Sequence, residues 1–126
     1  MTDVQTKDVT SSVDAYFEMW NEQDAAKRLD AIERAWTPDG AYVDPLQQAQ
    51  GYQGLSDMVA AVHQQFPGQR FRRTSGVDEH HSLARFGWEL VADDGGVTVA
   101  GLDVGIIADD GRFQRIAGFL GDLPDA

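Results

Sequence analysis

The sequence contains no cysteine, few basic residues and no long hydrophobic run. Without cysteine the chain has no disulfide framework, no thiolate nucleophile and no cysteine-ligated metal site. A membrane-spanning helix needs about 18 or more consecutive apolar residues, and no run approaches that length. The polar N-terminus, MTDVQTKDVTSS, lacks the apolar segment of a signal peptide, so we expect a cytoplasmic protein with no membrane partner.

The chain has 10 Lys and Arg residues against 21 Asp and Glu residues, which gives a net charge of −11. Binding to a phosphate backbone requires clustered basic side chains, so we expect no nucleic-acid partner. The sequence also lacks a glycine-rich phosphate loop, a Walker motif and a nucleophile elbow. We therefore expect no cofactor.

The length of 126 residues and the 42% hydrophobic content are typical of one globular domain. We predict a flexible tail over residues 1–10 and a single domain over residues 11–126. Apolar residues at helical spacing predict three helices, over residues 11–20, 24–35 and 55–66. Between the second and third helices we predict a turn at TPDG (37–40), a short strand that Pro45 ends, and a loop over 46–54.

From residue 69 onward the apolar pattern changes from helical spacing to alternation. It predicts four strands, over residues 69–77, 83–91, 97–107 and 113–121. Turns with the sequences ADDGG and ADDGR separate the last three strands. Helices followed by an antiparallel meander are typical of the α+β class, which we predict here.

Asp103 is the only charged residue of the predicted strand VTVAGLDVGII. Alternation places it on one face with Gly101 and Gly105, which leave space beside it for a ligand or for a large neighbouring side chain. A buried carboxylate must be protonated, hydrogen-bonded or in contact with a water-filled cavity. Asp103 is therefore either a pocket residue or a structural aspartate bonded to Tyr16 or to a backbone amide.

Asp44 stands at the end of the short predicted strand, directly before Pro45. An aspartate before proline commonly accepts hydrogen bonds from the amides of a turn, which is one interpretation. A carboxylate that projects into a pocket can instead remove a proton from carbon or activate water. Tyr16 has a similar ambiguity, because its helical spacing makes it a core residue whether or not its hydroxyl also serves a pocket.

Aromatic residues are numerous for a chain of this length, and they either pack in the core or line an apolar ligand pocket. Phe86 and Trp88 share one face of the strand at 83–91. We expect Trp88 to line the cavity. The candidate residues for contact with a small apolar ligand are Trp36, Tyr42, Phe66, Phe86 and Trp88.

The two adjacent histidines, His80 and His81, would point to opposite faces of a regular strand, or lie in a tight turn. One of them can serve a pocket as an acid or base, and we include His81 among the candidate catalytic residues. A metal site that adds His63 lacks the usual ligand spacing, so we expect no metal.

The order of elements, with YFEMWNEQD, AWTPDGAYVDP and LDVGIIADDGRFQRIAGF at its landmarks, resembles the nuclear transport factor 2-like superfamily. More narrowly, residues 12–121 resemble its SnoaL-like branch, which includes polyketide cyclases and is related to ketosteroid isomerase. The resemblance implies a cystatin-like fold, in which a strongly curved, mostly antiparallel sheet forms a cone closed by three N-terminal helices. It also implies a pocket inside the cone and a homodimer formed through the outer face of the sheet.

Three positions match the ketosteroid isomerase pattern. The resemblance implies that Asp44 is the general base, and that Tyr16 and a protonated Asp103 donate hydrogen bonds to an oxyanion. It implies an isomerase or cyclase that transfers a proton alpha to a carbonyl of an apolar substrate. The alternative is a ligand-binding or dimeric scaffold protein of the same fold, because this fold serves enzymes and binders alike.

Overall fold

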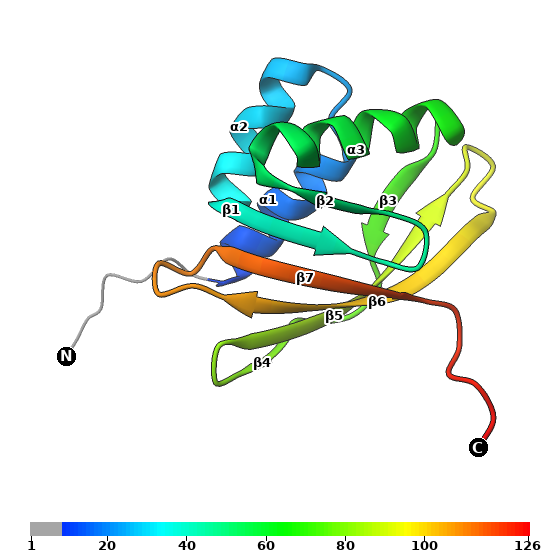
Figure 1. Ribbon diagram of the computed structural model, residues 1–126. Helices are drawn as coiled ribbons and strands as arrows, with labels where there is room; N and C mark the ends of the chain where they lie inside the picture. The colour runs from blue at the N-terminus through cyan, green and yellow to red at the C-terminus, as the bar shows by residue number, and fades with distance from the viewer. Residues whose placement is uncertain (1–8) are drawn as a thin grey trace.

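The computed structural model describes residues 9–126, and over that range it contains three helices and one curved sheet (Figure 1). The helices are α1 (Val9–Asn21), α2 (Ala25–Ala35) and α3 (Gly51–Gln65). The strands are β1 (Trp36–Val43), β2 (Gln48–Gln50), β3 (Arg70–Arg73), β4 (Asp78–His80), β5 (Leu83–Val91), β6 (Val97–Ile107) and β7 (Phe113–Leu120). The predicted α+β class is confirmed. Within the described residues, no helix combines the length and the apolar character needed to cross a bilayer.

The sheet follows the strand order β2-β1-β7-β6-β5-β3, and the short strand β4 pairs with β5 beside that path. Neighbouring strands are antiparallel except β1 and β7, which run parallel. The sheet curves strongly without closing, and the helices cover one of its faces (Figure 1). This arrangement confirms the predicted curved sheet and leaves a hollow between the helices and one end of the strands.

The strands predicted at 83–91 and 97–107 are confirmed with the same bounds. Residues 83–91 alternate between buried and more exposed positions, and residues 97–107 form a run rich in β-branched residues between two turns, and both patterns are strong strand signals. Helix α1 begins at Val9 and includes residues 9 and 10 of the predicted tail, and Val9 is buried. The rest of that predicted tail, residues 1–8, lies outside the described residues.

The predicted turn at TPDG is wrong, because these residues belong to β1. A register shift between Trp36 and Ala41, in the pairing of β1 with β7, accommodates Pro38 within the strand. Gly40 is required there because an added Cβ would lie 2.5 Å from the Trp36 ring. The predicted loop at 46–54 is also wrong, since it contains β2 and the start of α3, which Gly51 initiates at φ +78°.

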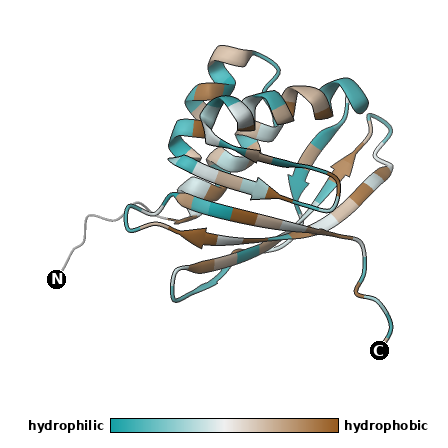
Figure 2. Ribbon diagram, viewed as in Figure 1, coloured by the Kyte–Doolittle hydropathy of each residue, from teal (hydrophilic) through white to brown (hydrophobic). Residues whose placement is uncertain are grey.

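The core lies between the helices and the concave face of the sheet. Figure 2 shows hydrophobic segments along β6 and β7, in agreement with the alternation of these strands. The start of α1 is attached to the turn between β6 and β7 by the buried Ser12, whose Oγ donates to the carbonyl of Gly111 at 2.7 Å. The largest fully buried side chains are Trp36, Tyr16, Phe86 and Phe113.

The connection between α1 and α2 is held by Arg28, which is only 4% exposed. Its guanidinium donates to the carbonyls of Glu22 and Gln23 at 3.0 and 3.1 Å, and to Oγ of Ser56 on α3 at 3.2 Å. These bonds satisfy carbonyls just beyond the end of α1, where the helix leaves acceptors unpaired. They fix the end of α1, with Trp20, against the hollow.

Candidate active site

A hollow of about 340 Å³ opens between α1, the end of α3 and the inner face of the sheet. Its volume suits a small organic molecule, and most of its wall is apolar, as in typical ligand sites. The polar side-chain groups of the wall are two carboxyls, two tyrosine hydroxyls, the indole N–H groups of Trp20 and Trp88, and two glutamine amides. The residues that line it are Tyr16, Phe17, Trp20, Tyr42, Asp44, Leu46, Gln47, Val62, Gln65, Phe66, Phe71, Trp88, Leu90, Val99, Asp103 and Leu120.

Asp103 projects from the centre of β6 into this hollow and is 3% exposed. Its Oδ2 accepts a hydrogen bond of 2.6 Å from the Tyr16 hydroxyl, and its Oδ1 accepts one of 2.9 Å from the Trp88 indole. The small neighbours of Asp103 make room for large side chains, because Trp88 lies over Gly101 and Phe113 over Gly105. Asp103 is thus both hydrogen-bonded to Tyr16 and part of the hollow.

Burial raises the pKa of Asp103 to about 6, which the hydrogen bonds from Tyr16 and Trp88 oppose and the nearby charge of Asp44 reinforces. At neutral pH the carboxyl is therefore mostly ionised, and it can gain a proton near pH 6. Burial and the charge of Asp103 also raise the pKa of the Tyr16 hydroxyl well above its usual value, so Tyr16 keeps its proton. Asp103 is therefore a carboxyl group whose pKa lies close to physiological pH.

Asp44 is half-buried in the same wall of the hollow, two strands away from Asp103 in the sheet, where β1 turns into β2. Its Oδ1 accepts hydrogen bonds from the backbone N–H groups of Leu46 and Gln47 at 2.8 and 3.0 Å. Its Oδ2 accepts a bond of 2.7 Å from the Tyr42 hydroxyl. The two interpretations of Asp44 therefore combine, because the carboxylate organises the turn and also faces the hollow.

The two carboxyl groups converge over Gly118, on the strand β7 that lies between them. A side chain at this position would place its Cβ 2.9 Å from Oδ1 of Asp103, 3.0 Å from the Tyr42 hydroxyl and 3.2 Å from Cβ of Asp44. Only glycine leaves this space open. Sequence reasoning missed Gly118, because a glycine in FQRIAGFLG carries no signal of what faces it across the sheet.

Three of the five predicted ligand-contacting residues, Tyr42, Phe66 and Trp88, line the hollow. Trp36 and Phe86 do not, because they are fully buried behind Tyr16, with ring centroids 5.9 and 5.7 Å from its ring. Phe86 was proposed because it shares a strand face with Trp88, and Trp36 because it follows the inner stripe of the second predicted helix. The hollow occupies only one end of the concave face, and neither residue reaches that end. The lining residues that were not proposed as ligand contacts include Phe17, Trp20, Val62, Phe71, Leu90 and Leu120.

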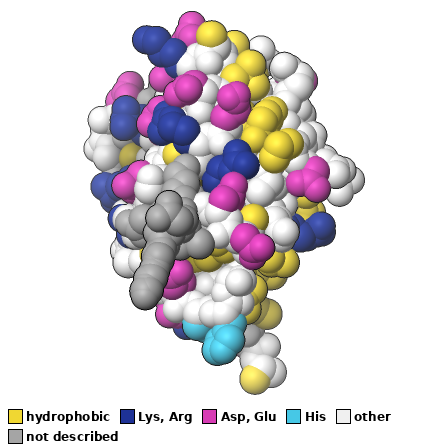
Figure 3. All heavy atoms as spheres, turned by 90° about the vertical axis from the view of Figure 1, so that its left-hand side faces the viewer, with side chains coloured by type: hydrophobic (Ala, Val, Ile, Leu, Met, Phe, Trp, Pro, Cys, Tyr) yellow, Lys and Arg dark blue, Asp and Glu magenta, His cyan; other side chains and the backbone are white. Residues whose placement is uncertain are grey.

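The structure does not bring His81 to the hollow. His80 and His81 lie exposed at the turn between β4 and β5, where His81 has φ +48° and the two Nδ1 atoms are 3.1 Å apart. Figure 3 shows histidine side chains on the surface at the lower end of the molecule. His63 is elsewhere, with Nε2 2.7 Å from the carbonyl oxygen of Trp20. In the part of the chain that the structure describes, no three His, Asp or Glu side chains form a possible metal site.

Comparison with known proteins identifies the family and agrees with the fold. The model of the SnoaL-like domain matches residues 13–116. The crystal structure of a proposed isomerase of the SnoaL-like family from Agrobacterium tumefaciens str. C58 is 36% identical, with a TM-score of 0.84 over 90% of this chain and 97% of that one. The search of curated proteins returns no match for this sequence.

More distant structures share the fold. A proposed polyketide cyclase from Sinorhizobium meliloti is 18% identical, with a TM-score of 0.66 over 85% of this chain and 92% of that one. A protein with a cystatin-like fold from Methylobium petroleophilum PM1 is 15% identical, with a TM-score of 0.73 over 98% and 82% of the two chains. The fold and the family model agree, and this chain belongs to the SnoaL-like family.

Proposed function

We propose that the protein is a small-molecule enzyme of the isomerase or cyclase type, which moves a proton alpha to a carbonyl of an apolar ring substrate. The observation that carries this proposal is the pair of carboxyl groups in one largely apolar hollow, in unlike environments. Asp103 is 3% exposed and its pKa is raised to about 6 by burial, whereas Asp44 is half-buried and receives two backbone N–H bonds. Unlike environments assign acid and base roles to such pairs.

In the proposed reaction Asp44 is the base. Its carboxylate takes the proton from the carbon beside the carbonyl, and the electron pair of the broken C–H bond passes into the developing enolate. A bound apolar substrate displaces water from around Asp103 and favours its protonated form. Protonated Asp103, with Tyr16 beside it, then donates to the enolate oxygen. Return of the proton from Asp44 to another carbon gives isomerisation. In cyclisation the enolate carbon instead forms a C–C bond to a second carbonyl carbon of the substrate, and the alkoxide that results takes up the proton held by Asp44.

The aromatic wall supports a ring substrate. Trp20, Phe71 and Trp88 pack in sequence with ring centroids 5.0 and 5.6 Å apart, and all three line the hollow. Rigid aromatic faces bind flat apolar rings at little cost in side-chain entropy. The wall would therefore hold the ring while its carbonyl meets the carboxyl pair.

The test uses cyclic ketones, steroids and polyketide mimics, which are first screened for binding by thermal shift. Binders are then incubated in D2O, and NMR measures exchange of their alpha hydrogens for deuterium. Asp44→Asn is expected to abolish exchange while leaving ligand affinity close to that of the wild type. Exchange at the wild-type rate in Asp44→Asn would contradict the base assignment. Ligand binding without exchange in the wild type would instead support the alternative, a non-catalytic binding protein.

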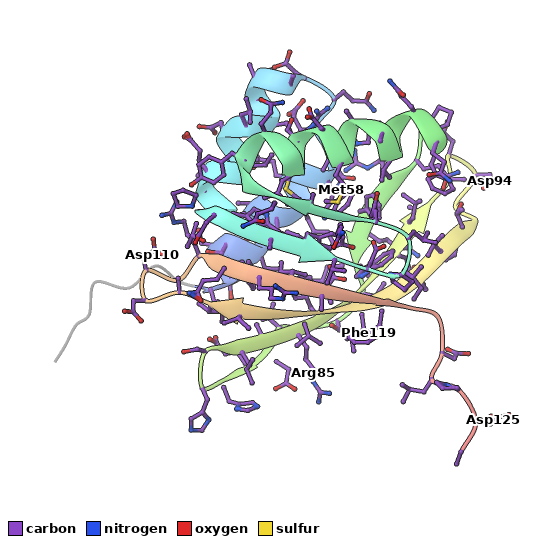
Figure 4. All side chains as sticks on the ribbon, viewed as in Figure 1. Met58, Arg85, Asp94, Asp110, Phe119 and Asp125 are labelled. Atoms are coloured by element: carbon purple, nitrogen blue, oxygen red, sulfur yellow. The ribbon has the colours of Figure 1, made fainter. Side chains whose placement is uncertain are left out.

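We also propose that the protein forms a homodimer through the outer face of the sheet. Leu102 and Phe119 are cross-strand partners on β6 and β7 and are 37% and 57% exposed. Ile106, on the same face, is 42% exposed. Figure 4 shows Phe119 pointing away from the helices, on the same side as Arg85. Arg85, beside this face, is paired with Asp78 of the same chain, and the centre of the face around Leu102 and Phe119 is apolar and fits a second copy of itself.

Analytical ultracentrifugation tests the dimer. Phe119→Asp is expected to convert the dimer to a monomer, because two carboxylates would face each other across the two-fold axis. Leu123→Asp is the matched control, since Leu123 is 92% exposed beyond the sheet and should leave the dimer intact. A wild-type protein that sediments as a monomer at micromolar concentration would contradict the proposal.

A further inference from the structure

We infer that the hollow accepts neutral or cationic ring molecules and excludes the same molecules when they carry a carboxylate or phosphate. This inference rests on the proposed function only in taking the hollow as the ligand site. It adds the charge class of the ligand, which decides between large groups of candidate substrates.

The ionisable side chains around the hollow are all acidic or phenolic. Asp44, Asp103, Tyr16 and Tyr42 line it, and among the described lining residues there is no Lys, Arg or His. Every formal charge in the wall is therefore negative. An anion that entered would lose its hydration without gaining an opposite charge, and it would be repelled by the carboxylates.

The hydrogen-bond donors of the wall are already directed at the carboxyl groups. The Tyr16 hydroxyl and the Trp88 indole N–H donate to Asp103, and the Tyr42 hydroxyl donates to Asp44. An anionic ligand needs several such donors. The other side-chain donors of the wall, the indole N–H of Trp20 and the amides of Gln47 and Gln65, carry no charge, and the Gln47 amide lies 3.5 Å from Oδ2 of Asp44. A ligand N–H or O–H, in contrast, can use the free lone pairs of the carboxyl oxygens.

The aromatic part of the wall also favours cations over anions. The faces of Trp20, Phe71 and Trp88 carry the negative part of the ring quadrupole, which attracts cations and not anions. A neutral carbonyl can accept a hydrogen bond from Asp103 when Asp103 is protonated. Protonation makes Asp103 neutral, so the site still has no positive charge that could attract an anion.

The experiment uses one ring system in four charge forms. The probes are 6-acetyl-2-naphthoic acid, its methyl ester, its primary amide and the corresponding aminomethyl compound. Their affinities are measured by isothermal titration calorimetry at pH 7.5 and physiological salt, where charges beyond about 8 Å are screened. The acid is expected to bind roughly tenfold or more weakly than the ester, the size of one charge repulsion across a partly buried site. The amine is expected to bind at least as tightly as the ester.

Charge-neutral variants locate the cause of the discrimination. Asp44→Asn should narrow the gap between acid and ester, and Asp103→Asn is the second variant in case the first fails to fold. Asp57→Asn is the matched control, because Asp57 lies exposed on α3, outside the lining, and its loss changes the net charge by the same amount. The control should leave the gap unchanged.

The pH dependence gives an independent readout. The titratable groups that face Asp103 are Tyr16 on α1, and Tyr42 and Asp44 at β1. Burial raises the pKa of both phenols, so they stay neutral over the range tested. Lowering the pH from 7.5 to 5.5 should therefore protonate Asp103, whose pKa burial raises to about 6, and improve binding of the acid relative to the ester in the wild type. Asp103→Asn should lack this improvement.

The outcomes are distinct. Equal binding of acid and ester, failure of every neutral and cationic probe to bind, or weaker binding of the amine than of the acid would each overturn the inference. So would an Asp57→Asn control that narrows the gap as much as Asp44→Asn. The proposed function fails separately, when the ester binds but its alpha hydrogens do not exchange in D2O. In that case the charge preference still stands on the binding data.

Discussion

The two faces of β6 reverse the usual distribution of polar and apolar residues. On the inner face Asp103 lies 3% exposed among aromatic rings, while on the outer face Leu102 and Ile106 are 37% and 42% exposed. A strand with one buried face normally places apolar residues inside and polar residues outside. Burying a carboxyl group and exposing large apolar side chains both lower stability. Folding alone therefore does not explain why these residues are there. Asp103 on the inner face borders the hollow, and we propose that it serves ligand binding. The exposed apolar residues of the outer face serve, in our proposal, contact with a second copy of the chain.

The largest expected effect comes from changing the inner face. Asp103→Leu keeps roughly the size of the side chain but removes its proton donor, so it should slow alpha-deuterium exchange roughly 10²–10³-fold, as for loss of one oxyanion donor. Asp109→Leu, at the exposed turn after β6, is the matched control and should retain the wild-type rate. A purely structural Asp103 would give a lower Tm with an unchanged rate per folded molecule, and this result would contradict the assignment.

The pH dependence of stability gives the next effect. Because folding raises the pKa of Asp103 from 3.8 to about 6, its protonated form stabilises the fold fully below pH 4, and this contribution is lost as the pH rises through 6. The loss amounts to roughly 3 kcal/mol for an almost fully buried group. Urea unfolding of wild type and Asp103→Asn between pH 4 and 7 measures it. As the pH rises from 4 to 7, the wild type should lose stability relative to Asp103→Asn. A difference in unfolding free energy that stays constant over this range would show that Asp103 is not desolvated.

A smaller effect is expected at Gly118, where the two carboxyl environments meet. Gly118→Ala would bring a methyl group to 2.9 Å from Oδ1 of Asp103 and 3.0 Å from the Tyr42 hydroxyl. The crowding should cost about 1–3 kcal/mol of stability and reduce ligand affinity. Gly76→Ala is the control, since an added Cβ there meets nothing within 4 Å. Calorimetry and thermal unfolding measure both quantities; unchanged affinity in Gly118→Ala would mean that the ligand does not reach this space.

Much of the fold could be predicted from the sequence because its signals are periodic. Residues 83–91 alternate between buried and more exposed positions, residues 97–107 form a run rich in β-branched residues between two turns, and the helices repeat apolar residues at helical spacing. Strand β1 could not be predicted over its full length, because Pro38 and Gly40 have the local chemistry of a turn. There, pairing with β7 and the contact of Gly40 with Trp36 decide the conformation. Local propensity lost to tertiary contacts at this point.

The site was predictable in its acids and less so in its walls. Asp103 and Asp44 stand out because each interrupts an apolar strand pattern, and the hydrogen bond of Asp103 with Tyr16 was one of the alternatives considered. Trp36 and Phe86 were misplaced, since alternation gives the face of a strand but not the position of a hollow along it. The role of Gly118 became visible only from the pairing of β7 with both β1 and β6, which places Gly118 directly across from Asp103.

The most direct test of the central claim is an NMR titration of the Asp103 side-chain carboxyl carbon, with and without the neutral ester in the hollow. Our account predicts a pKa of about 6 in the free protein, which burial causes. It also predicts a higher pKa with the ester bound, because the ligand removes the remaining water. A pKa near or below about 4 in both states, the ordinary value for a solvated aspartate, would contradict it.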